Sequence, residues 1–97
     1  MTILPRPPST GIGTGTDPQT LALAALGWVL GEEDRAQRFL ALTGLTPDEL
    51  RAALGDPAML AGVIEFLCAH EPDLVAAAQA LGVAPQTLAA IGAELGA

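Results

Sequence analysis

The segment that most constrains the fold is residues 57–70, PAMLAGVIEFLCAH, which is apolar over most of a helical circumference. At about 100° per residue, its large apolar side chains fall within one broad arc. The opposite side carries mostly small residues, so a second helix could approach it closely or water could reach its backbone. We therefore expect a central helix over residues 57–70, on which the other segments pack. The arc comprises Met59, Leu60, Val63, Ile64, Phe66 and Leu67, and the opposite side Ala58, Ala61, Gly62, Glu65 and Ala69.

The composition favours helices throughout the chain. Hydrophobic residues make up 51% of the 97 residues and charged residues 15%, so much of the chain must pack. Aromatic residues are scarce at 3%, and no run of Val, Ile, Thr and Tyr is typical of a strand. The sequence therefore predicts an all-α fold, a compact bundle of five to six short helices at mixed angles around the central apolar helix.

Proline and glycine mark the ends of the flanking helices. Asp17 and Asp56 each precede a proline that presets the first helical residue, and Thr46 with Glu49 forms a capping box. Along the second helix, Asp34 and Arg38 are spaced to form an ion pair. The predicted helices cover residues 18–30, 32–43, 47–54, 72–81 and 85–95, and glycines 31, 44, 55 and 82 follow four of them.

Residues 1–16, MTILPRPPSTGIGTGT, mix proline with glycine, serine and threonine and have no helical or strand period. We expect them to form a disordered tail, followed by a single helical domain over residues 17–97. The longest apolar run, residues 21–30, covers ten residues, about half of a membrane span. No cationic region precedes this run, so we expect neither a membrane helix nor a cleavable signal.

The charge balance is strongly acidic. The net charge is −7, because eleven carboxylates face four arginines and the chain has no lysine. From Asp17 onward, three arginines face all eleven acids, which leaves −8. This field repels phosphate backbones and anionic lipids and favours a basic partner. The lone Cys68 excludes an internal disulfide and any multi-thiolate metal site, and it fits a cytoplasmic location.

Two corners recur at an offset of 38 residues, GLTPDEL at 44–50 and GVAPQTL at 82–88. Either a duplicated helical hairpin or repeated capping signals explain this echo. Both corners also have the spacing of a helix-turn-helix unit. A recognition helix needs cations, but the first corner offers only Arg51, beside Asp48 and Glu49, and the second offers none. The acidic field therefore argues against nucleic-acid binding, and a degenerate helix-turn-helix DNA-binding or transcription-related module is the alternative function.

Residues 18–95 carry a family likeness. It rests on RFLALTGL at 38–45, GDP at 55–57 and VIEFL at 63–67, followed shortly by Glu71. With these motifs the chain resembles a family of short, all-helical alphaproteobacterial proteins of unknown function. The resemblance implies a bacterial, cytoplasmic setting and supplies no activity.

The side chains needed for catalysis are sparse. Cys68 and His70 point about 200° apart on a helix, so they cannot form a nucleophile and base pair there. We expect His70 to contact carbonyls at its helix end, Cys68 to fill a small site, and Glu65 to be solvated. Ser9, the one serine, lies in the tail. We therefore expect no enzyme, no cofactor and no metal.

Trp28 is the candidate for a partner surface. Its helix is apolar over more than half of its circumference, which exceeds one core contact, and the acidic Glu32, Glu33 and Asp34 follow. Core packing and a role as an interface anchor both account for the tryptophan. We expect a non-enzymatic protein-interaction or regulatory module with an unidentified protein partner, and a self-associating homodimer as a further alternative.

Overall fold

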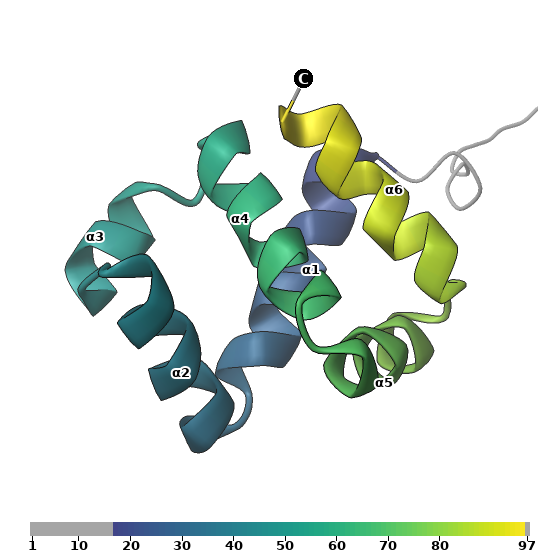
Figure 1. Cartoon of the computed structure of the whole chain (residues 1–97). Helices are drawn as coiled ribbons and strands as arrows, with labels where there is room; N and C mark the ends of the chain where they lie inside the picture. The colour runs from purple at the N-terminus through teal and green to yellow at the C-terminus, as the bar shows by residue number, and fades with distance from the viewer. Residues whose placement is uncertain (1–16, 97) are drawn as a thin grey trace, which may run out of the picture.

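The computed structural model describes residues 17–96 and forms six helices packed into a compact globule (Figure 1). The all-α prediction is confirmed, and the described residues include no strand. The predicted tail, residues 1–16, lies outside the described residues, and the domain limits stay a prediction. The helices are α1 (Pro18–Leu30), α2 (Glu33–Thr43), α3 (Pro47–Ala52), α4 (Pro57–Cys68), α5 (Glu71–Leu81) and α6 (Pro85–Gly96).

The predicted helix starts are confirmed to within one residue, but two helix ends differ by two residues. Helix α3 ends at Ala52 rather than at 54, because the amide of Ala53 already closes a tight last turn on the carbonyls of Glu49 and Leu50. Helix α4 ends at Cys68 rather than at 70. His70 has an extended backbone and serves as the cap residue of α5, so the chain turns two residues before the predicted break.

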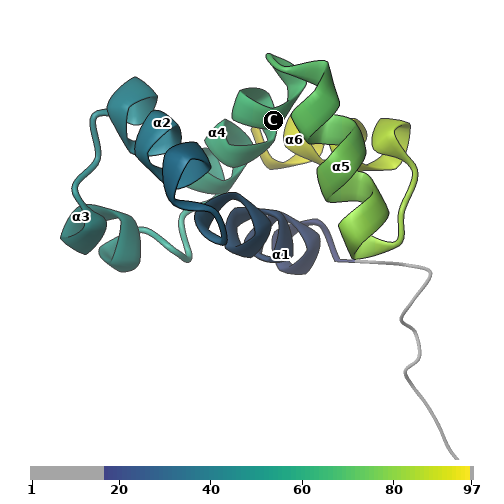
Figure 2. The same cartoon turned by 90° about the horizontal axis from the view of Figure 1, so that it is seen from below.

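Helix α4 lies at the centre, as predicted. It packs against α1, α5 and α6, while α2 contacts α1 and α4. In Figure 1, α2 and α3 lie on one side of α4 and α5 and α6 on the other, and Figure 2 shows α1 passing beneath α4. The fully buried large side chains come from four helices, namely Val29, Phe39, Leu60, Val63, Ile64, Leu67 and Leu88.

Helices α4 and α6 approach each other closely on the large-residue face of α4. A Cβ atom placed on Gly92 of α6 would stand 2.8 Å from Cγ2 of Ile64. Ala61, one turn before Ile64, is also buried and lies near the end of α6, whereas Glu65 is exposed as predicted. The two helices can therefore pack closely because position 92 of α6 is a glycine.

Phe39 is the buried residue by which helix α2 packs on this core. Phe39 is fully buried and meets the edge of Phe66 on α4 at a centroid distance of 5.3 Å and an interplanar angle of 87°. Ala36 and Leu40 of the same helix are only half-buried. One side of α2 therefore lies on the core, and the rest of the helix projects from it.

Candidate functional site

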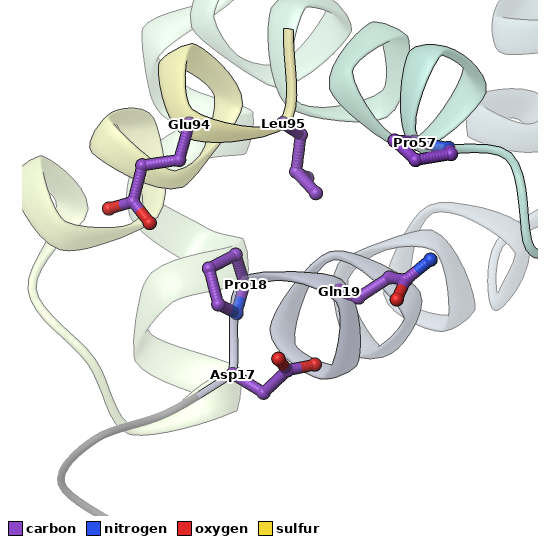
Figure 3. Close-up of a pocket in the computed structure, with 6 residues that line it drawn as sticks. All are labelled: Asp17, Pro18, Gln19, Pro57, Glu94 and Leu95. Atoms are coloured by element: carbon purple, nitrogen blue, oxygen red, sulfur yellow. The ribbon is translucent and has the colours of Figure 1, made fainter. Parts of the chain in front are cut away.

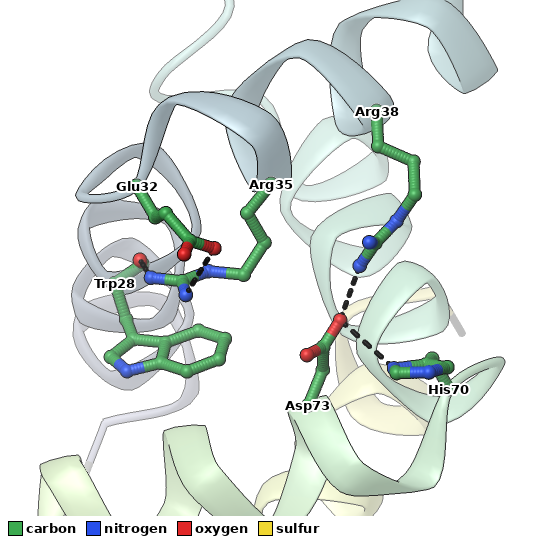
Figure 4. A network of polar contacts seen from close by, with 6 residues as sticks. All are labelled: Trp28, Glu32, Arg35, Arg38, His70 and Asp73. Atoms are coloured by element: carbon green, nitrogen blue, oxygen red, sulfur yellow. Dashed lines mark hydrogen bonds and ion pairs between the residues drawn. The ribbon is translucent and has the colours of Figure 1, made fainter.

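Trp28 lies at the junction of α1 and α2, where it contacts Arg35. We call the group of Trp28, Arg35 and Glu32 the clamp. The indole is half-buried against the core, and the guanidinium carbon of Arg35 lies 3.6 Å from the centre of its ring (Figure 4). Arg35 also donates to the carbonyl oxygen of Trp28 and, at 3.1 Å, to Oε1 of Glu32. Trp28 therefore has a packing role, and part of its indole is left accessible.

The acids expected beside Trp28 lie at the surface. Glu32, Glu33 and Asp34 are all exposed at the start of α2, where carboxylates complement the helix dipole. Glu32 is held by Arg35, so it belongs to the clamp as well as to the acidic surface. The sequence-predicted residues thus lie together around the α1–α2 junction.

The predicted pair between Asp34 and Arg38 is wrong. Arg38 instead donates to Oδ2 of Asp73 on α5, and the same oxygen lies 3.1 Å from Nδ1 of His70 (Figure 4). Arg38 also stands over the ring of Phe66, at 5.1 Å from its centre. His70 contacts a carboxylate rather than the carbonyls predicted for it. This cluster joins α2 to α5, and local sequence spacing gave no signal of it because Arg38 and Asp73 are 35 residues apart.

Cys68 is exposed instead of filling a small internal site. Neighbouring atoms still shield the sulfur enough to raise the pKa of the thiol, and the negative charge of Glu65 raises it further. A raised pKa lowers the thiolate fraction at neutral pH, so this cysteine is not an activated nucleophile. Across residues 17–96, no three His, Cys, Asp or Glu side chains gather to hold a metal ion.

One pocket of about 380 Å³ lies where α1 and α4 begin and α6 ends (Figure 3). Asp17 caps α1 by accepting from the amide of Thr20 at 2.9 Å, and Gln19 donates to the carbonyl of Gly55 at 3.2 Å. These polar groups hold the helix starts in place, so the pocket reads as a structural junction. Its lining residues are Asp17, Pro18, Gln19, Pro57, Glu94 and Leu95.

A second, more apolar pocket of about 220 Å³ lies between the end of α1, α2 and α3. Leu30 and Leu54 at its rim remain 39% and 36% exposed, whereas Leu50 is buried. The sequence alone does not predict this pocket, because its lining residues come from three separate segments of the chain. We call it the leucine pocket, lined by Leu30, Leu40, Pro47, Leu50, Arg51 and Leu54.

The two glycine corners form as predicted. Gly44 and Gly82 have φ angles of 76° and 75°, the left-handed conformation that ends a helix. At the first corner, Thr46 and Glu49 form the predicted capping box, with reciprocal contacts of 3.1 and 3.0 Å. Arg51, the one cation of α3, is paired with Asp48 at 2.7 Å, and α6 has no cation. Each corner has the shape of a helix-turn-helix unit, but it lacks the free positive charges that contact with DNA phosphates requires.

No single helix among residues 17–96 is long and apolar enough to span a membrane. Helices α5 and α6 reach that length and composition only as a pair, which is bent by 99° where they meet. Both helices pack on α1 and α4.

The comparisons with known proteins identify a family. No curated protein and no solved structure matches the chain. The model of a family described as "Protein of unknown function (DUF3572)" matches residues 15–97, which include all six helices and both pockets. The chain therefore belongs to the DUF3572 family of proteins of unknown function.

Proposed function

We propose that this chain is a non-enzymatic interaction or regulatory module, which binds a protein partner in the cytoplasm of an alphaproteobacterium. The observation that carries the proposal is the exposure of large apolar side chains on an acidic protein. Within residues 17–96, three such side chains from α1 and the segment after α3 are between 36% and 40% exposed, namely Leu23, Leu30 and Leu54. When a partner covers such apolar surface, the free energy of binding becomes more favourable by about 25 cal/mol per Å² buried.

The chemistry of the described residues supports binding over catalysis. The thiol of Cys68 has a raised pKa, and the imidazole of His70 contacts Asp73 at a helix junction. In nucleophilic catalysis, a histidine held by a carboxylate contacts the nucleophile. Here His70 and Asp73 instead connect the turn after α4 to α5. The proposal therefore needs neither a cofactor nor a metal.

A degenerate helix-turn-helix module is the second candidate, and the Gly44 corner is the observation that favours it. The ion pair of Arg51 with Asp48 argues for protein contact at this corner rather than contact with phosphates. Retardation of a DNA fragment by the pure protein at low salt would favour this candidate over the first.

Affinity capture from an extract of the source bacterium tests the proposal. The wild type and a double variant, Glu33→Lys with Asp34→Lys, serve as baits. The double variant reverses two exposed charges and leaves the contact between Arg35 and Glu32 intact. We expect one stoichiometric protein to be captured by the wild type and lost from this variant. Glu94→Lys, at the far end of α6, is the matched control and should retain the protein. Recovery of nucleic acid alone, or of nothing, would overturn the proposal.

A further inference from the structure

The leucine pocket continues along one exposed face of α1. Leu23, Gly27 and Leu30 are spaced at i, i+4 and i+7, so they lie in one row on the helix surface. Leu23 is 40% exposed, and a Cβ placed on Gly27 would meet no atom within 4 Å. The row therefore lies open to solvent, and it leads through Leu30 into the pocket. We call the row and the pocket together the leucine groove.

The dimensions of the pocket indicate which kind of ligand it accepts. Sites for small molecules and cofactors usually enclose about 300–1,000 Å³. The leucine pocket holds about 220 Å³ and opens to solvent beside Leu30 and Leu54. A volume of this size suits one or two apolar side chains of a protein segment better than a whole cofactor. Anchors of that kind supply most of the affinity of a protein interface.

The charges around the leucine groove select the partner further. Arg51 is the one charged residue that lines the pocket, and exposed acids neighbour the lining residues in sequence. The charge of Arg51 is balanced by Asp48 at 2.7 Å. The other two arginines of the described chain are also ion-paired, Arg35 with Glu32 and Arg38 with Asp73. Of the exposed acids nearby in sequence, Glu32 and Asp48 are taken up by these pairs. The others form no ion pair among residues 17–96, namely Glu33, Asp34, Glu49 and Asp56.

We propose that the leucine groove binds a basic, amphipathic helix of a partner protein. Apolar side chains at i and i+4 of that helix fill the leucine pocket and lie along Leu23 and Leu30, while its lysines and arginines are attracted by the exposed acids that neighbour the groove residues in sequence. A second copy of this chain is a poor occupant, because residues 17–97 carry three arginines against eleven acids and would repel their like. The inference rests on the proposed function and assigns the surface and the class of partner.

Selection from a library of random 16-residue peptides displayed on phage tests the groove. With the wild-type protein as bait, we expect enrichment of peptides that carry lysine or arginine and apolar residues at helical spacing. Binding of a selected peptide, measured by fluorescence anisotropy, should weaken several-fold when salt rises from about 0.05 to 0.5 M, because salt screens the attraction between the acidic protein and the basic peptide. Enrichment of acidic peptides, or of none, would overturn the inference.

Substitutions at the groove locate the peptide. Leu54→Asp, at a position outside any helix, should weaken binding by about tenfold or more, as expected for an anchor site. The matched control is Leu42→Asp, because Leu42 is 72% exposed on α2 and does not line the pocket. The helical circular dichroism signal of both variants should match that of the wild type. Equal affinity of the two variants would place the peptide elsewhere and overturn the inference.

The failure of this inference can be distinguished from the failure of the proposed function. If the Leu54→Asp bait still captures the stoichiometric protein from an extract, the interaction module stands and the leucine groove is not its site. If both Leu54→Asp and the paired variant Glu33→Lys with Asp34→Lys lose that protein while Leu42→Asp retains it, one acidic, leucine-lined surface carries the interaction.

Discussion

Gly92 of α6 lies directly against Ile64 of α4 where these two helices pack together. A Cβ atom on Gly92 would lie 2.8 Å from Cγ2 and 3.0 Å from Cβ of Ile64. These atoms belong to the stiff, branched part of the isoleucine, so they cannot swing aside as the end of a longer side chain would. The two helices can therefore approach this closely only while position 92 lacks a side chain.

Gly92→Ala should destabilise the protein. The added methyl group forces α4 and α6 apart, and overpacking of this kind costs about 1–3 kcal/mol, partly offset by the better helix propensity of alanine. We expect the free energy of unfolding to fall by about 1–2 kcal/mol after this offset, measured by urea titration of the helical circular dichroism signal. An unchanged midpoint would contradict the contact between Gly92 and Ile64.

Gly62→Ala is the matched substitution on α4 and should have the opposite sign. Gly62 also lies inside a helix, but a Cβ placed there would meet no atom within 4 Å. The substitution should therefore raise the free energy of unfolding by about 0.5–1 kcal/mol through helix propensity alone. The difference between the two alanine variants isolates the steric term at Gly92.

Asp17→Ala should destabilise α1 by about 0.5–2 kcal/mol, because the carboxylate accepts from the amide of Thr20 and caps the helix start. The control is Asp17→Asn, which keeps an acceptor at the same place and should retain most of the stability. Thermal unfolding of the three proteins under one buffer condition checks this order. Equal losses in both variants would indicate that charge, rather than the cap, is responsible.

The helix starts could be predicted from the sequence because their signals are local. Asp17, Thr46 and Asp56 act on amides only two or three residues away, so capping chemistry suffices to locate the helices that they open. The ends of α3 and α4 were less accurately placed. No glycine follows Ala52 or Cys68 directly, and the turns there depend on how the chain enters the next helix.

The contacts between helices could not be predicted in the same way. The pair of Arg38 and Asp73 depends on the rotation of α2 against α5, and the contact of Gly92 with Ile64 depends on the approach of α6 to α4. Helical periodicity identifies the apolar face of a helix but does not predict which other helix packs against that face. The acidic residues expected beside Trp28 are at the surface, whereas the stacking of Arg35 on that indole was not foreseen.

Arg35→Lys should weaken the clamp at Trp28. Lysine keeps the charge but lacks the planar guanidinium that stacks on the indole and reaches both Glu32 and the carbonyl of Trp28. We expect a loss of about 0.5–2 kcal/mol and a red shift of the tryptophan emission, which reports on one residue because the chain has one tryptophan. Arg51→Lys, in an exposed pair, is the control and should change stability by less than about 0.5 kcal/mol.

The thiol of Cys68 should react slowly with iodoacetamide, because its raised pKa leaves less thiolate at a given pH. The rate in the folded protein should rise with pH to a midpoint above that of the urea-unfolded chain. Glu65→Gln removes the smaller of the two causes, so the midpoint should fall part of the way, while desolvation by burial keeps it above the unfolded value. Glu71→Gln, an exposed acid that does not contribute to the shift, should leave the midpoint unchanged. A midpoint that returns fully to the unfolded value in Glu65→Gln would make charge, and not burial, the dominant cause.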